Sequence, residues 1–129
     1  KYVNATAATT KGGDFFANAR EKREADKKES LAKLNDVLDN VKSGDEAKQK
    51  ASEQIAKLTD RSKAETDIET LILAKGFKDC VAVLSDNNIS VVVKCSSDGL
   101  LDSETRQIQD IVATNSKISL ENIKIIEIK

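Results

Sequence analysis

The sequence predicts an α+β fold in which a helical hairpin precedes an α-β-β-α-β unit with a three-stranded sheet. Three observations support this prediction: apolar residues recur at helical spacing before residue 75, two short β-branched runs flank an Asp-Asn-Asn turn, and a helical segment separates them from a third apolar run. Within the 129 residues we expect a flexible leader at 1–13, the helical hairpin at 14–60 and the sheet domain at 61–129.

The first helix is predicted to begin at Asp14, acting as N-cap, and to end near Lys42. Residues 21–30 are almost entirely charged and lack an apolar stripe, so we expect this half to project into solvent. Deleting residues 14–30 should then cost only about 1 kcal/mol. The second half should pack on the next helix through a face that recurs at i, i+3, i+7 and i+10: Leu31, Leu34, Leu38 and Val41.

The second helix is predicted from Asp45 to about Lys75. Ser43 and Glu46 have the spacing of a capping box at its start. Residues 59–62 contain no apolar side chain, so the sequence allows either a break there or a continuous helix. Gly76 should end the helix, because a left-handed conformation is least costly without a Cβ.

Two strands follow, and the intervening Asn87-Asn88 favours a two-residue hairpin turn. In that register Cys80 lies directly opposite Cys95, within reach of a disulfide. The sequence leaves two alternatives open: a bridge, or two free thiols that behave as small apolar side chains.

A helix from Ser103 to Thr114, capped by Asp102, should cover one face of the sheet and lead to a last strand. In both strand orders open to this unit the last strand lies at an edge, where its backbone can pair with another sheet. Alternatively, Lys124, Glu127 and Lys129 keep the edge from pairing. The expected partner-binding residues are Gln107, Asp110, Thr114, Glu121, Asn122, Ile123, Lys124, Ile125, Ile126, Glu127 and Ile128.

The composition points away from catalysis. The chain has no His, and no nucleophile has a candidate base, so we expect no enzymatic activity, no cofactor and no metal site. A KH-like RNA-binding module shares the strand and helix order, but it needs a Gly-x-x-Gly loop. Gly76 and Gly99 are isolated in an acidic half of the chain, so nucleic acid is not the expected ligand.

Several residue groups, taken in order and spacing, resemble the extracytoplasmic region of the stage III sporulation protein AH-like family. They are Asp14-Phe15-Phe16, Ala19-Arg20, Arg23-Glu24, Ala74-Lys75-Gly76-Phe77, Asp79-Cys80-Val81, Ile89, Val91-Val92-Val93, Gln107-Ile108 and Ile111-Val112.

The resemblance implies a ring-building-motif domain, similar to those of secretion and flagellar rings. It also implies a structural part of the channel between mother cell and forespore, in the space between the two membranes. The partners implied are stage II sporulation protein Q, which has a LytM-like domain, and further copies in a ring. A membrane helix is implied upstream of residue 1. Arg20 and Arg23 match the family pattern, which suggests contact with a partner or with lipid headgroups, whereas charge alternation alone suggests a solvated helix.

Overall fold

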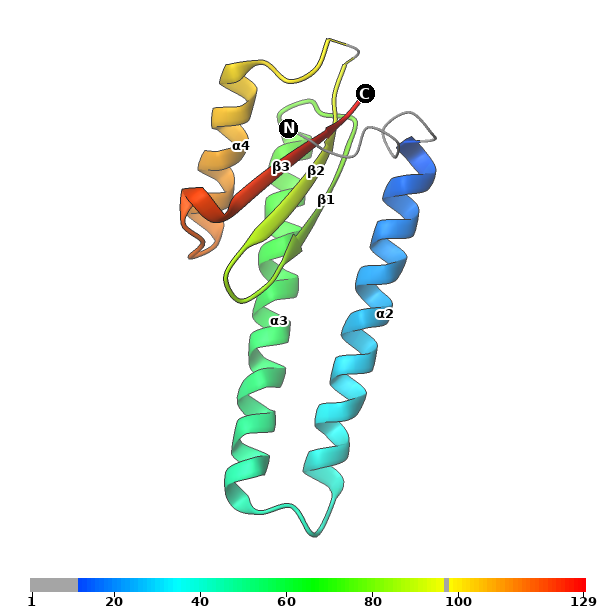
Figure 1. The fold of residues 1–129 in the computed structure, drawn as a ribbon, viewed down its shortest axis with the longest axis vertical. Coiled ribbons are helices and arrows are strands. Elements are labelled where there is room, and N and C mark those ends of the chain that lie inside the picture. Colours follow the sequence, from blue (N-terminus) through cyan, green and yellow to red (C-terminus); the bar gives the residue numbers. More distant parts are fainter. Residues whose placement is uncertain (1–11, 97) are drawn as a thin grey trace.

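The computed structural model describes residues 12–96 and 98–129 (Figure 1). The predicted α+β class and element order are confirmed. In order, the elements are α2 (Gly12–Asp39), α3 (Asp45–Ala74), β1 (Asp79–Leu84), β2 (Ile89–Lys94), α4 (Asp102–Asn115), a 3-10 turn (Leu120–Asn122) and β3 (Ile123–Ile128).

Helices α2 and α3 form the long hairpin of Figure 1, with the sheet beside only the half that lies away from the connecting loop. Helix α2 begins at Gly12, so Asp14 falls in its first turn and is not the predicted N-cap. The rest of the expected leader, residues 1–11, lies outside the described residues. Helix α3 runs without a break through residues 59–62, so the continuous alternative is correct and one helix crosses the expected boundary at residue 60.

The ends of α3 match the prediction at one terminus only. Its N-cap is Gly44, which provides no side-chain bond, so the predicted capping box of Ser43 and Glu46 is wrong. At the other end Gly76 has φ +106°, as predicted, and its N–H donates to the carbonyl of Leu73 at 3.0 Å. Left-handed backbone at this position lets the chain leave the helix and enter β1 within a few residues.

The sheet has the order β1-β2-β3, with β1 antiparallel to β2 and β2 parallel to β3. Its hairpin register differs from the prediction, because Cys80 pairs with Val93 and not with Cys95. The loop holds four residues: Ser85 donates its N–H to the carbonyl of Asn88 at 2.8 Å and its hydroxyl to the same oxygen at 3.0 Å. Both cysteines are free thiols, so the second of the two alternatives that the sequence left open is the one found.

Two apolar clusters lie on opposite faces of the sheet. Helices α3 and α4 cover one face with Ile68, Ile72, Ile108 and Val112, against a strand set that includes Val91. The other face is covered by the start of α2, where Phe16, fully buried, packs with strand residues. The strand residues of this second cluster are Val81, Val92 and Ile128, with Ile126 at its margin.

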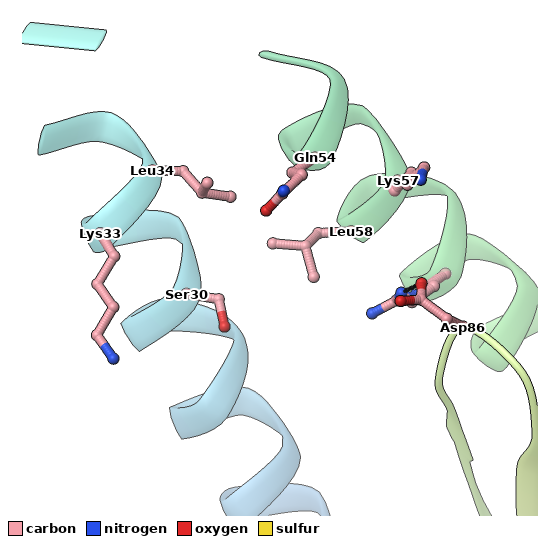
Figure 2. A pocket seen from close by; sticks show the side chains of 8 residues that line it. Ser30, Lys33, Leu34, Gln54, Lys57, Leu58 and Asp86 are labelled. Atoms are coloured by element: carbon pink, nitrogen blue, oxygen red, sulfur yellow. Dashed lines mark hydrogen bonds and ion pairs between the residues drawn. The ribbon is translucent and has the colours of Figure 1, made fainter. Parts of the chain in front are cut away.

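The expectation that the first half of α2 projects into solvent is therefore wrong at Phe16, which is buried on the sheet. The charged N-terminal half of α2 docks on the sheet, while Val41, at the far end of the hairpin, is 91% exposed. Between these ends a groove of about 370 Å³ separates α2 from α3 (Figure 2), and Leu34 and Leu58 point toward one another across it. The predicted packing of the second half thus holds near Leu34 and fails at Val41.

Candidate functional site

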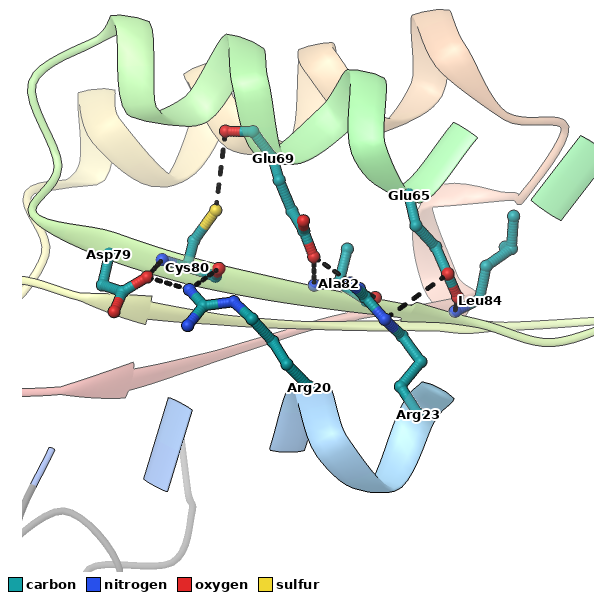
Figure 3. Close-up of polar contacts among 8 residues, drawn as sticks. All are labelled: Arg20, Arg23, Glu65, Glu69, Asp79, Cys80, Ala82 and Leu84. Carbon is teal, nitrogen blue, oxygen red and sulfur yellow. Dashed lines mark hydrogen bonds and ion pairs between the residues drawn. The ribbon is translucent and has the colours of Figure 1, made fainter. Parts of the chain in front are cut away.

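The outer edge of β1 is covered by side chains. Figure 3 shows Glu65 and Glu69 reaching this strand from α3, and Arg20 and Arg23 reaching it from α2 on the opposite side. We call these four residues the β1 clasp. Together they form hydrogen bonds with the β1 backbone groups to which a neighbouring strand would otherwise bond.

The hydrogen bonds of the β1 clasp follow the period of the strand. Backbone groups of alternate residues point away from β2, and these are the groups that the clasp contacts. The N–H groups of Ala82 and Leu84 each donate to a glutamate carboxylate at 2.8 Å, from Glu69 and Glu65 respectively. The carbonyl of Ala82 accepts from Arg23 at 2.6 Å, and that of Cys80 accepts from Arg20 at 3.2 Å.

Arg23 is the centre of the clasp. Its guanidinium lies 2.5 Å from a carboxylate oxygen of Glu69 and 3.8 Å from one of Glu65. All three side chains are largely removed from solvent, at 17% exposed for Arg23, 15% for Glu69 and 9% for Glu65. Such pairs depend on complete hydrogen bonding, and no buried side-chain polar atom in the described residues lacks a partner.

The pKa values of Glu65 and Arg23 are both raised, but for different reasons. Burial raises the pKa of Glu65, although the Leu84 N–H and the charge of Arg23 oppose this. Burial alone would lower the pKa of Arg23, but the hydrogen bond and charge of Glu69, with the charge of Glu65, raise it overall. Two carboxylates share one guanidinium here, so the backbone N–H groups of β1 supply the remaining stabilisation of negative charge.

Arg20 extends the contact along α2. It forms an ion pair with Asp79 at the start of β1, and its guanidinium lies 5.9 Å from the ring centroid of Phe16. Phe15 packs edge-on against Phe16, with ring centroids 5.7 Å apart. One turn of α2 therefore contributes both apolar burial on the sheet face and polar bonds at the strand edge.

The opposite edge of the sheet is formed by β3. The carbonyl of Ile128 accepts from the N–H of Cys95 at 2.8 Å, so it points toward β2. Because backbone direction alternates along a strand, the groups of Ile123 and Ile125 point away from β2. The N–H of Ile123 donates to the carbonyl of Leu120 in the preceding turn, which makes Ile125 the central outward residue of this edge.

The expected partner-binding residues divide by exposure. Gln107, Asp110 and Thr114 lie exposed on α4, as do Glu121, Asn122 and Lys124 near the start of β3. Ile125, Ile126 and Glu127 are partly buried. The side chains of Ile123 and Ile128 belong to the two apolar clusters, so these two side chains are not available to a partner.

Comparison with known proteins places the chain in a family. The family model described as SpoIIIAH-like protein matches residues 2–125. The chain belongs to the SpoIIIAH-like family. A search of curated proteins gave no match.

Two solved structures share the fold. A chain described as "Structure of the SpoIIQ-SpoIIIAH pore forming complex" superposes with a TM-score of 0.74 and 19% identity, covering 88% of this chain and 97% of that one. EscJ, a type III secretion system protein of enteropathogenic E. coli, gives a TM-score of 0.51 and 27% identity, with 72% of this chain and 62% of EscJ covered. The predicted ring-building-motif fold is thereby confirmed.

The residues that the sequence did not connect are those of the β1 clasp. Arg20 and Arg23 were expected to be solvated or to contact a partner or lipid headgroups, but they bond to β1 and α3 within the chain. A signal was present: Arg20 and Arg23 are three apart and Glu65 and Glu69 four apart, so each pair occupies one helix face. Nothing in the sequence indicated that the two faces meet.

The two thiols are poorly suited to form the reactive thiolate. Burial, with the charges of Glu69 and Asp79, raises the pKa of Cys80 to about 12. Burial, and to a smaller extent the negative charge of Glu127, raise the pKa of the Cys95 thiol. Among residues 12–96 and 98–129, no three His, Cys, Asp or Glu side chains are grouped to hold a metal ion. No helix in these described ranges is both long and apolar enough to span a bilayer.

Proposed function

We propose that this chain is the extracytoplasmic domain of a structural channel component in endospore formation, located between the mother-cell and forespore membranes. It binds a SpoIIQ-type protein and assembles with further copies of itself into a ring. Membership of the SpoIIIAH-like family and the ring-building-motif fold support this proposal. Its role is binding and assembly, with no catalytic step.

The observation that carries the proposal is the difference between the two sheet edges. The outward backbone of β1 is bonded to the clasp, whereas β3 is the terminal strand on the other side and presents the backbone of Ile125. An extended segment of a partner can add to such an edge through main-chain hydrogen bonds. Because those bonds need no side-chain chemistry, binding requires no cofactor.

Specificity would come from exposed side chains beside this backbone. Gln107, Asp110 and Thr114 recur at i, i+3 and i+7 on the exposed side of α4, while Ile108 and Val112 of the same helix are buried. Lys124 is exposed near the start of β3. We propose that these polar groups select the partner strand, in the way that flanking side chains do in other cases of strand addition.

The test is to remove one backbone donor without removing the side-chain volume that surrounds it. Ile125→Pro deletes the outward N–H, and Ile125→Val is its matched control because valine keeps the N–H. Leaving a partner carbonyl unsatisfied costs about 1–3 kcal/mol, so affinity for a SpoIIQ-type ectodomain should fall by about 5- to 150-fold. Titration calorimetry measures this affinity, and circular dichroism verifies that both variants are folded.

Lys22→Ala serves as a second control, because Lys22 lies on the exposed face of α2 and pairs with Asp26 in the next turn. It should bind like the unmodified chain. Equal affinity for Ile125→Pro and the unmodified chain, with both folded, would contradict the proposal and place the interface away from β3. Sedimentation velocity with the ectodomain present tests assembly, which predicts species larger than a one-to-one complex.

A further inference from the structure

The helical hairpin is loosely packed where the sheet does not reach it. Between Ser30 and Leu58, a stretch that the structure describes in full, Ala51 is the only buried residue. Leu34 and Leu58 point toward one another across the groove of about 370 Å³ in Figure 2, and each is only half-buried. Two helices cannot enclose a core by themselves, so apolar stripes of this kind call for a further element to cover them.

The groove is a separate surface from the β3 edge. Its walls are α2 and α3, and it is bounded at one end by the β1–β2 loop, where Asp86 forms an ion pair with Arg61. From Ser30 and Leu58 it continues into a second cavity of about 180 Å³, which reaches Arg23 in the β1 clasp. The groove is therefore open in the structure in which α2 is docked on the sheet.

The lining of the groove has an excess of positive charge. It includes Lys33, Lys57 and Arg61 but a single carboxylate, Asp86, although the whole chain has a net charge of −1. Asp86 neutralises Arg61, whereas neither lysine forms an ion pair with a described residue. Each lysine directly precedes a groove leucine in the sequence. The complementary ligand therefore carries carboxylates beside apolar groups.

The walls of the groove favour a helix as its ligand. Six of the eight lining residues are polar or charged, whereas small-molecule pockets are mostly apolar. An extended peptide would leave its own backbone groups without partners, because the walls are helices whose backbone groups are bonded internally. A helix satisfies its own backbone and can lay an apolar stripe between two others. In a symmetric contact, the hairpin of a second copy would bring its own lysines against Lys33 and Lys57.

We propose that the groove between α2 and α3 binds an acidic amphipathic helix of another protein. One face of that helix packs its apolar side chains on Leu34 and Leu58, and its flanking carboxylates pair with Lys33 and Lys57. The three helices then form a bundle in the half of the hairpin that the sheet does not reach. This goes beyond the proposed function, because it adds a second binding surface to the β3 edge.

The probes are two synthetic peptides of about 15 residues, each with leucine at i, i+3, i+7 and i+10. In one peptide the residues beside the leucines are glutamate, and in the other they are lysine. Added to the unmodified chain, the glutamate peptide should shift the methyl NMR signals of Leu34 and Leu58 and leave those of Ile125 unchanged. Its affinity, measured by fluorescence anisotropy, should fall as salt is added. A glutamate peptide that does not bind, or that binds no better than the lysine peptide, would overturn the proposal.

Charge reversal in the groove should exchange the two peptides. Lys33→Glu/Lys57→Glu should lower affinity for the glutamate peptide by about tenfold or more, since each substitution replaces an attraction by a repulsion, and should allow the lysine peptide to bind. The matched control is Lys28→Glu/Lys50→Glu, which makes the same change in net charge on exposed positions of the same two helices outside the groove. It should keep the preference of the unmodified chain. Equal losses in the two variants would show that net charge alone governs binding, and would overturn the proposal.

The apolar contact is tested by Leu58→Gln, which keeps the length of the side chain and should weaken binding of the glutamate peptide by about tenfold. Leu71→Gln is its control, because Leu71 is 41% exposed on the same helix and does not line the groove. Equal affinities of the two variants would overturn the contact with Leu58.

Sedimentation velocity of the chain alone tests the other occupant. Self-association that Lys33→Glu/Lys57→Glu alters would assign the groove to a second copy and overturn the proposal. The peptide titration of the unmodified chain does not depend on any variant being folded. Because no SpoIIQ-type protein is present in these experiments, their failure is distinct from a failure of partner binding at β3.

Discussion

Substitution of Phe16 by alanine tests whether the charged half of α2 is part of the folded core. The ring is fully buried against Val81, Val92 and Ile128, and it contacts Phe15 edge-on. Burying such a side chain contributes about 1.5–3 kcal/mol, and the ring pair adds about 0.5–1.5 kcal/mol. With the cavity that remains, Phe16→Ala should reduce the free energy of unfolding by about 3–5 kcal/mol.

Urea unfolding monitored by circular dichroism measures this loss. For a domain of this size, a slope of about 2 kcal/mol per M converts a loss of about 4 kcal/mol into a midpoint lower by about 2 M. Val41→Ala is the control, since Val41 is 91% exposed, and it should change the stability by no more than about 0.5 kcal/mol. A loss below about 1 kcal/mol for Phe16→Ala would refute the docking of α2 and restore the expectation of a solvated segment.

Three further predictions concern single sites. Burial raises the pKa of Glu65, so the folded state keeps the proton of this carboxyl to a higher pH than the unfolded state does. The free energy of unfolding should therefore rise as pH falls from neutral toward the ordinary glutamate pKa of about 4.3. Glu65→Gln, which cannot titrate, should lack this gain. Urea midpoints measured across that range check the sign, and a difference that stays constant would contradict it. Protein purified without reductant should show the intact mass of two free thiols, with Cys80 unreactive toward a disulfide reagent until unfolding and Cys95 reacting first. Gly76→Ala should lower the free energy of unfolding by about 1–2 kcal/mol, because φ is +106° at this residue although a Cβ would meet no other atom. Gly44→Ala is the control: the space there is also open, but φ is −75°, so the substitution should be tolerated. Equal effects of the two substitutions on thermal unfolding would exclude the left-handed turn.

The element order was predictable because it depends on short-range patterns. Helical spacing, β-branched runs and Gly76 act within a few residues, and each indicated its element correctly. The hairpin register was not predictable in the same way. Asn87-Asn88 favours a two-residue turn, but bonds between Ser85 and Asn88 close a four-residue loop and shift every pair by two residues. A shift of two keeps each side chain on its own face, so the core survived the error and the cysteine pairing did not.

The docking of α2 could not be predicted from its periodicity. The charged residues 21–30 give no apolar stripe, and the residue that anchors the helix, Phe16, lies before them. Amphipathicity detects a helix that buries a long face, whereas α2 buries one aromatic ring and one arginine, Arg23, and places the half-exposed Arg20 beside β1. Such a helix has the composition of a solvated one.

The difference between a solvated and a docked charge pair lies in burial and not in spacing. Lys22 with Asp26 and Lys63 with Asp67 are i, i+4 pairs on exposed surface, where water and salt screen the charges and the pair contributes little to stability. Arg23 with Glu69 has the same charges, but it joins two helices across a strand edge and is largely removed from water. Breaking it would leave a buried carboxylate without its counter-ion, which costs more than the pair itself contributes. The same four charged side chains therefore hold α2 in place and keep β1 from pairing, so that stability of the domain and control of its edges depend on one set of contacts.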